Sequence, residues 1–294
     1  MAYETGAAAD RHDLLAKLKT FLQTAGWSVN LHAADGASGW RLHVAKDGVF
    51  ANLRSTSGSG EALSSGWSSS LQGLGLYGSK GFDAGLAWDN QPGAPRNSNN
   101  QMRGVTLPEA PGALPAYWFF AHETSVDVFV EVAVGQIRSL HWGNLVKFGD
   151  YAGGMYFGGS GRYNQATAFS LPFVTTTAFA YLEDADHANG WYNSNTARAI
   201  MPPLPSGTTS TDGFLSTILQ SALSLGGVTP LLPLYFATGS PNFWPLGYAP
   251  HLRVVRRDYL TVGAEIDLGD ETWMVFPIAD LGSLPLGLAV RKVL

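Results

Sequence analysis

The sequence of 294 residues contains no cysteine, which excludes disulfides, thiolate zinc sites and cysteine nucleophiles. Charge is scarce as well: Asp, Glu, Lys and Arg make up 14% of the chain, against a usual value of roughly 25%. The net charge is −5, so no basic excess is available to neutralise a phosphate backbone, and we expect no nucleic-acid partner. No apolar run approaches the roughly 18 residues of a membrane span, so we expect no membrane insertion.

Apolar and aromatic residues are abundant, at 45% and 12% of the chain. This content is enough to bury a sizeable core, and it argues against a disordered chain. The low content of charged residues has two open explanations. One is that other subunits cover much of the surface; the other is that a large β-protein exposes many Ser, Thr and Asn side chains in place of charged ones.

Two segments have the periodicity of an amphipathic helix. In DRHDLLAKLKTFLQTAGW, Asp10 or Asp13 is suited to cap the start and Gly26 to end the helix. Its apolar residues recur on one face of a 3.6-residue period: Leu14, Leu15, Leu18, Phe21 and Leu22. A second helix is predicted near 212–225, with a Gly-Gly stop after it.

Strand patterns dominate the rest. WRLHVAKDGVFANLR predicts a hairpin that turns at Asp47-Gly48. AYWFFAHE and SVDVFVEVAVG predict a second strand pair, with valines on one face and with Asp127 and Glu131 on the other, where they can reach water. The predicted fold is mainly β, with antiparallel, sandwich-like sheets, an N-terminal helix and one further helix, and an α+β arrangement stays open. The predicted organisation is a helical segment over 1–26 and a β-rich body over 27–294, for which a division near 104–115 also stays open.

No motif in the chain favours a catalytic, cofactor-binding or metal-binding residue. GLGLYG matches a dinucleotide fingerprint but has no helical pattern after it, so its glycines are interpreted as turn residues. LEDADHANGWYN is interpreted as a polar turn rather than an oxygen-ligand cation site, and RVVRR as a solvated strand edge. Asp127 and Glu131 form the one carboxylate pair on a common face, and a solvated strand face explains them better than glycoside hydrolysis.

Large aromatic side chains have three open interpretations: sugar-stacking platforms, subunit-interface anchors and core packing. The residues concerned are Trp67, Tyr77, Trp88, Trp142, Tyr151, Tyr156, Trp191, Tyr192 and Trp244.

Several blocks occur in a fixed order between Ala2 and about Gly159: AYETG with the following leucine-rich helix and AGW, then ANLRS, GLYGSKGFDAG, YWFFAHETSVDVFVEV and HWGNLVKFGDYAGGMYFGG. Together they resemble a family of tailed-bacteriophage virion proteins. After Tyr163 the chain departs from that pattern, with NQATAFSLPF in place of a Tyr/Pro-rich segment. The resemblance implies a virion or tail structural protein and carries no catalytic motif to this chain.

The function expected from this resemblance is that of a structural component of a phage virion, in the tail at the baseplate or tail tip. It would assemble in the host cytoplasm with copies of itself and with other virion proteins. The residues expected at its interfaces are Leu14, Leu18, Phe21, Trp142, Phe148, Tyr151 and Tyr156. The alternatives are a receptor-binding module that recognises a host surface glycan through Trp142 or Trp191, and a polysaccharide-degrading enzyme.

Overall fold

The structure is a computed structural model. It describes residues 2–36, 39–56, 63, 73–96, 99–100, 102–108, 112–162, 165–169, 180–184, 190–193, 197–200, 231–238, 244–256, 260–276 and 286–292. The predicted helix near 212–225 lies outside these residues.

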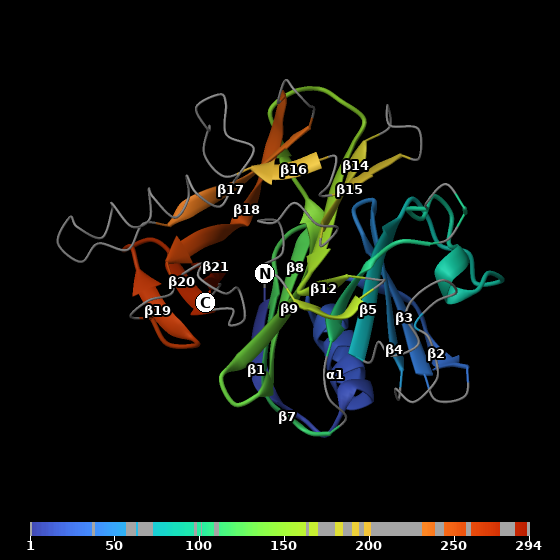
Figure 1. Ribbon diagram of the computed structural model, residues 1–294, viewed down its shortest axis with the longest axis horizontal. Helices are drawn as coiled ribbons and strands as arrows, with labels where there is room; N and C mark the ends of the chain where they lie inside the picture. The colour runs from blue at the N-terminus through green and yellow to red at the C-terminus, as the bar shows by residue number, and fades with distance from the viewer. Residues whose placement is uncertain are drawn as a thin grey trace.

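The described strands form three sheets, and their pairs are antiparallel (Figure 1). The mainly β, sandwich-like fold predicted from the sequence is confirmed. We call the three the N-terminal, central and C-terminal sheets; they run from the blue and cyan strands through the green ones to the orange and red ones.

The central sheet contains, in spatial order, β1 (Ala2–Ala8), β7 (Leu114–Ala121), β8 (Ser125–Ala133), β9 (Gln136–Asn144), β11 (Gly153–Gly159), β14 (Ala180–Asp184) and β15 (Trp191–Asn193). The N-terminal sheet contains β13 (Gln165–Phe169), β12 (Gly161–Arg162), β6 (Val105–Pro108), β5 (Gly73–Ser79), β4 (Val49–Thr56), β3 (Gly39–Lys46) and β2 (Ser28–Asp35). The C-terminal sheet contains β16 (Ala197–Ile200), β17 (Leu232–Thr238), β18 (Trp244–Arg256), β21 (Leu286–Lys292), β20 (Thr272–Phe276) and β19 (Ala264–Asp267), and the short strand β10 (Val146–Lys147) also pairs with β18.

The central sheet is covered on both faces. Consecutive residues of β7 belong to different cores: Phe119 packs in the core shared with the N-terminal sheet, and Phe120 in the core shared with the C-terminal sheet. Val128 and Phe129 of β8 divide in the same way. This double burial explains why YWFFA and VDVFVEV are so continuously apolar.

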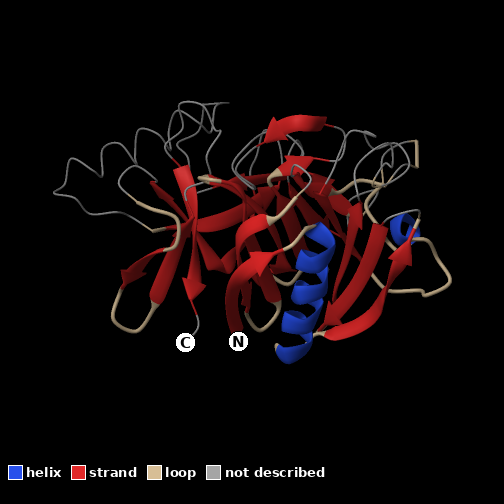
Figure 2. Ribbon diagram, turned by 90° about the horizontal axis from the view of Figure 1, so that it is seen from below, coloured by secondary structure: helices blue, strands red, loops and turns tan. Residues whose placement is uncertain are grey.

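The predicted N-terminal helix is α1 (Arg11–Thr24). The Asp10 carboxylate accepts hydrogen bonds from the backbone N–H groups of His12 and Asp13, as an N-cap does, and Gly26 follows with a φ of +80°. Figures 1 and 2 show α1 between the central and N-terminal sheets, and Phe21 contacts Phe119 there with ring centroids 5.5 Å apart. The apolar face of α1 is therefore buried in the chain's own core. Among the described residues no helix has the length and apolar character to cross a bilayer.

Segment 1–26 holds a strand that sequence reasoning missed. β1 pairs with β7 in register from Ala2 opposite Ala121, and the Thr5 hydroxyl donates to the Tyr117 carbonyl at 2.8 Å. AYETGAA has no clear strand alternation, so the pairing depends on β7, more than 100 residues away.

The predicted hairpin is confirmed as β3 and β4. Lys46 pairs with Val49, so Asp47 and Gly48 form a two-residue turn, and both have positive φ as this turn class requires. GLGLYG lies in β5, a fully buried strand, rather than in a turn. Gly78 is needed there because a Cβ would lie 2.7 Å from Met155 and Trp191 of the central sheet.

Candidate functional site

The structure separates the seven residues predicted at interfaces into two groups. Five are buried in the chain's own core: Leu14, Leu18, Phe21, Trp142 and Tyr156. Because this core already encloses their side chains, they offer no surface to another subunit. Their assignment as contacts is corrected to intrachain packing. Phe148 and Tyr151 lie at the surface.

Phe148 belongs to an exposed aromatic cluster that sequence reasoning found only in part. Its ring is 52% exposed and lies 5.9 Å from each of the rings of Tyr235 and Tyr248. Val146, two residues before Phe148, is 42% exposed, and the Tyr151 hydroxyl donates to the Leu246 carbonyl, which also accepts from the Phe148 N–H. We call Val146, Phe148, Tyr151, Tyr235 and Tyr248 the aromatic patch.

The aromatic patch forms because β10 pairs with β18 as an antiparallel strand. Val146 pairs with Tyr248, and the Phe148 N–H donates to the Leu246 carbonyl at 2.8 Å. Gly247 permits this approach, since a Cβ there would lie 2.4 Å from the Val146 carbonyl oxygen. Tyr235 and Tyr248 come from segments without a distinguishing local pattern, so only the strand pairing reveals them.

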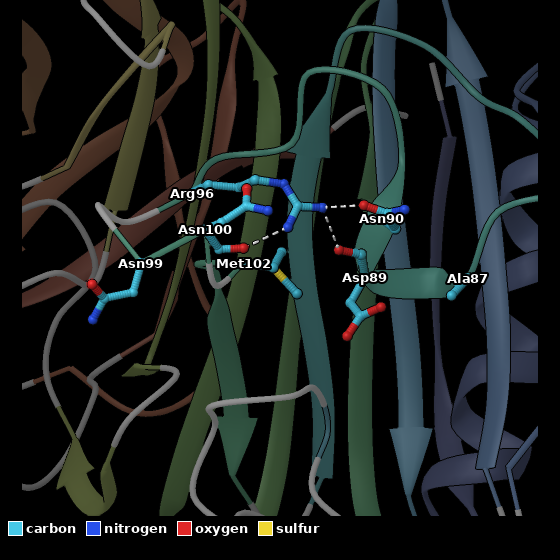
Figure 3. A pocket seen from close by; sticks show the side chains of 7 residues that line it. All are labelled: Ala87, Asp89, Asn90, Arg96, Asn99, Asn100 and Met102. Atoms are coloured by element: carbon cyan, nitrogen blue, oxygen red, sulfur yellow. Dashed lines mark hydrogen bonds between the residues drawn. The ribbon is translucent and has the colours of Figure 1, made fainter.

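A polar pocket of about 380 Å³ lies beside the 3₁₀ turn η1 (Trp88–Asn90). Arg96 spans it (Figure 3): its guanidinium donates to the Asn100 carbonyl at 2.7 Å, to the Asp89 carbonyl at 3.1 Å and to the Asn90 side-chain oxygen at 2.5 Å. The described residues that line it are Ala87, Asp89, Asn90, Arg96, Asn99, Asn100 and Met102. These bonds fix the guanidinium in place and leave amide and carboxylate groups along the walls.

Asp127 does not reach water, contrary to the sequence-based expectation. The C-terminal sheet covers the face of β8 opposite the valines, and Asp127 is fully buried beneath it. One Asp127 oxygen lies 2.8 Å from His141 Nδ1, and the other lies 3.8 Å from His122 Nε2. The His122 ring stacks on that of His251 with centroids 3.8 Å apart. We call these four residues the histidine–aspartate cluster.

Burial shifts the pKa values of Asp127, His122 and His251. It raises the pKa of Asp127 above its ordinary value, an effect that the hydrogen bond from His141 opposes. It lowers the pKa of His122 to about 2 and that of His251 to about 4. A hydrogen-bonded Asp–His pair suits proton transfer in principle, but both side chains are fully buried, so no substrate reaches them in this fold. Among the described residues, no group of three or more His, Asp or Glu side chains is placed to hold a metal ion.

The remaining sequence candidates have structural roles where they are described. Arg253 lies in β18, an interior strand, and stacks over Trp273 at 4.5 Å, so the solvated-edge interpretation is wrong for this residue. Glu131 accepts a hydrogen bond from the Gly135 N–H at a hairpin. The polar segment around Glu183 connects the paired strands β14 and β15, and its residues 185–189 lie outside the described part.

The aromatic residues considered as sugar platforms are mostly enclosed. Those buried are Tyr77, Trp88, Trp142, Tyr156 and Trp191. Trp67 and the side chains of Tyr192 and Trp244 lie outside the described part. Recognition of a glycan through Trp142 or Trp191 is therefore not available in this fold.

No protein-family model matches this chain, and no curated protein matches it either. Support for a function therefore comes from the sequence blocks and from the surface features described above.

Proposed function

We propose that this chain is a structural subunit of a bacteriophage virion, placed in the tail at the baseplate or tail tip, and that it acts by oligomeric assembly. The ordered blocks between Ala2 and about Gly159 support the virion assignment, because they resemble tailed-phage virion proteins. The aromatic patch carries the assembly part. Phe148 is exposed and its Tyr neighbours are half-buried, and clustered aromatic side chains at a surface often anchor protein interfaces.

A second copy of the chain fits the aromatic patch best. Lys147 and Asp150 flank Phe148, both are exposed, and they carry opposite charges. In a twofold dimer the same surface meets itself. With the axis through the paired Phe148 rings, Lys147 would exchange its bond to the Tyr151 carbonyl for Asp150 of the partner subunit. Such complementarity selects the partner and its orientation.

Reversing one of these charges is expected to weaken self-association, and reversing both is expected to restore it. Lys147→Asp or Asp150→Lys places like charges opposite each other and should raise the dimer Kd about tenfold. The double variant re-creates both opposite-charge pairs and should return close to the wild-type Kd. Phe148→Ala should raise the Kd by roughly 30-fold or more, as loss of an interface anchor does. Sedimentation velocity over a concentration series measures all four.

Val134→Ala is the matched control, because Val134 is another exposed apolar side chain on a distant turn and should leave the Kd unchanged. A wild-type chain that stays monomeric at high concentration would contradict the assembly model. A double variant no better than either single reversal would sink the proposed Lys147–Asp150 pairing.

The virion assignment is tested separately. Mass spectrometry of phage particles purified from lysed host cells that carry the gene should detect the chain in a fixed ratio to the other tail proteins. Recovery only in the particle-free fraction would refute the assignment, whatever the oligomeric state.

Recognition of a host surface glycan is a second candidate, and the polar pocket favours it. Its volume lies within the usual range of ligand sites, and its walls offer amide, carboxylate and guanidinium groups that suit sugar hydroxyls. On a glycan array, wild-type binding that falls with Asp89→Ala but not with Asp150→Ala would support it. An array without signal would count against it.

A further inference from the structure

The stacked rings of His122 and His251 join two sheets. His122 follows β7 in the turn that leads to β8, where its N–H donates to the Ser125 carbonyl at 2.9 Å. His251 belongs to β18 of the C-terminal sheet. The rings are nearly parallel, at 10°, with centroids 3.8 Å apart, and His122 is 1% exposed. Within the described part of the chain, the His122 nitrogens and His251 Nδ1 have no hydrogen-bond partner, and the nearest carboxylate oxygen to His122, that of Asp127, lies 3.8 Å from Nε2.

Positive charges near the two rings disfavour protonation of either imidazole. Arg291 of β21 and Arg253 of β18 act on His251, and the His251 ring and Arg291 act on His122. Of the nearby carboxylates, Glu271 is engaged on both oxygens: it pairs with Arg291 at 3.2 Å and accepts from the Trp273 indole at 3.1 Å. Asp127 is bonded to His141 through one oxygen, and its other oxygen lies 3.8 Å from His122 Nε2, beyond hydrogen-bond distance. Tyr156 on β11, near Asp127, stays neutral because burial raises its pKa.

We propose that the His122–His251 stack is an acid-sensitive latch: its rings hold the C-terminal sheet to the central sheet when neutral and release it when protonated. The apolar core between the central and N-terminal sheets is a separate cluster from the one between the central and C-terminal sheets, so we expect it to stay packed when the latch opens.

The sign of the pH effect follows from the buried rings. Their pKa values, about 2 for His122 and about 4 for His251, lie below the ordinary 6.5. The opened form therefore binds more protons than the closed form as the pH falls from 6.5 towards 4, and the closed form loses stability over that window. At about pH 4.5 each ring shifts the opening equilibrium by roughly 100-fold. Asp127 acts in the opposite direction, because its pKa is raised, and reduces the net shift.

The absence of native cysteine permits a site-specific test. Ala249→Cys places one thiol in the core between the central and C-terminal sheets, and Ala51→Cys places one in the core between the central and N-terminal sheets; both alanines are fully buried. Each variant is labelled with an aromatic disulfide reagent that reacts with thiols in acid. Between about pH 7.5 and pH 4.5, the labelling rate at position 249 relative to position 51 should rise by about 100-fold or more.

Three further variants separate the latch from general acid unfolding. The double substitution His122→Phe with His251→Phe keeps a ring stack that cannot be protonated, and it should abolish the relative rise at position 249. If that variant does not fold, the single substitution His251→Gln is used, because His251 is partly exposed and its replacement disturbs the core less. It should reduce the rise. His43→Gln is the control, because the pKa of His43 is also lowered to about 4 by burial, but His43 lies in the N-terminal sheet. It should leave the acid-induced rise in the absolute labelling rate at position 249 unchanged and act only on position 51. Simultaneous labelling at both positions, or an undiminished rise in the His251 variants, would overturn the proposal.

Discussion

Replacing Trp142 by alanine is expected to lower the free energy of unfolding by about 3–5 kcal/mol, a large part of the stability of a typical domain. Trp142 is fully buried in β9, opposite Val126 and Phe157, and its ring makes an edge contact with Trp27 at 6.1 Å. Removing the indole leaves a cavity where the central sheet meets the N-terminal sheet. Urea denaturation followed by circular dichroism measures the loss.

Trp40→Ala is the control for Trp142→Ala. Trp40 is 39% exposed and its one described ring contact is with His32, so its loss should cost about 1 kcal/mol or less. The comparison also decides between a core and an interface role. An interface tryptophan would weaken self-association and leave the unfolding of the monomer unchanged, and that result for Trp142 would overturn its placement in the core.

Replacing Phe129 by alanine is expected to lower the free energy of unfolding by a similar amount, about 3–5 kcal/mol, through the other core. Phe129 projects from β8 towards the C-terminal sheet and stacks on Phe276 of β20, with centroids 3.8 Å apart and planes at 11°. Phe120 meets both rings edge-on, at 6.2 and 6.0 Å. Calorimetry or urea denaturation of the single variant measures the effect.

A double-mutant cycle with Phe276→Ala isolates the ring pair. Because the two rings are in direct contact, the double variant should lose less than the sum of the single losses, with a coupling of about 0.5–1.5 kcal/mol. Strict additivity would mean that the two rings do not touch in solution and that the C-terminal sheet is not seated on β8 as described.

Features encoded within a few residues were predictable. The N-cap at Asp10, the stop at Gly26 and the Asp47-Gly48 hairpin turn each depend on local backbone chemistry, and each is confirmed. The strand β1 was not predictable, since its pairing partner lies far along the chain.

Burial of a predicted strand face was not predictable either. Alternation places Asp127 on the face opposite the valines, but a third sheet, formed largely by residues beyond 230, covers that face. The same reason explains why residues predicted at interfaces are buried in the core. Periodicity showed that Leu14, Leu18 and Phe21 form an apolar face that must be buried, but it did not show that the same chain buries it.

The sequence by itself determined a β-rich chain without thiol chemistry, its first helix with its caps, and the Asp47-Gly48 hairpin, because those depend on composition and on neighbours along the backbone. Only the tertiary structure decided which faces are enclosed, which aromatic rings stay at the surface and which histidines meet an aspartate. Those outcomes depend on sheets that stack residues far apart in sequence, and a periodic pattern specifies a side chain's direction without specifying what lies there.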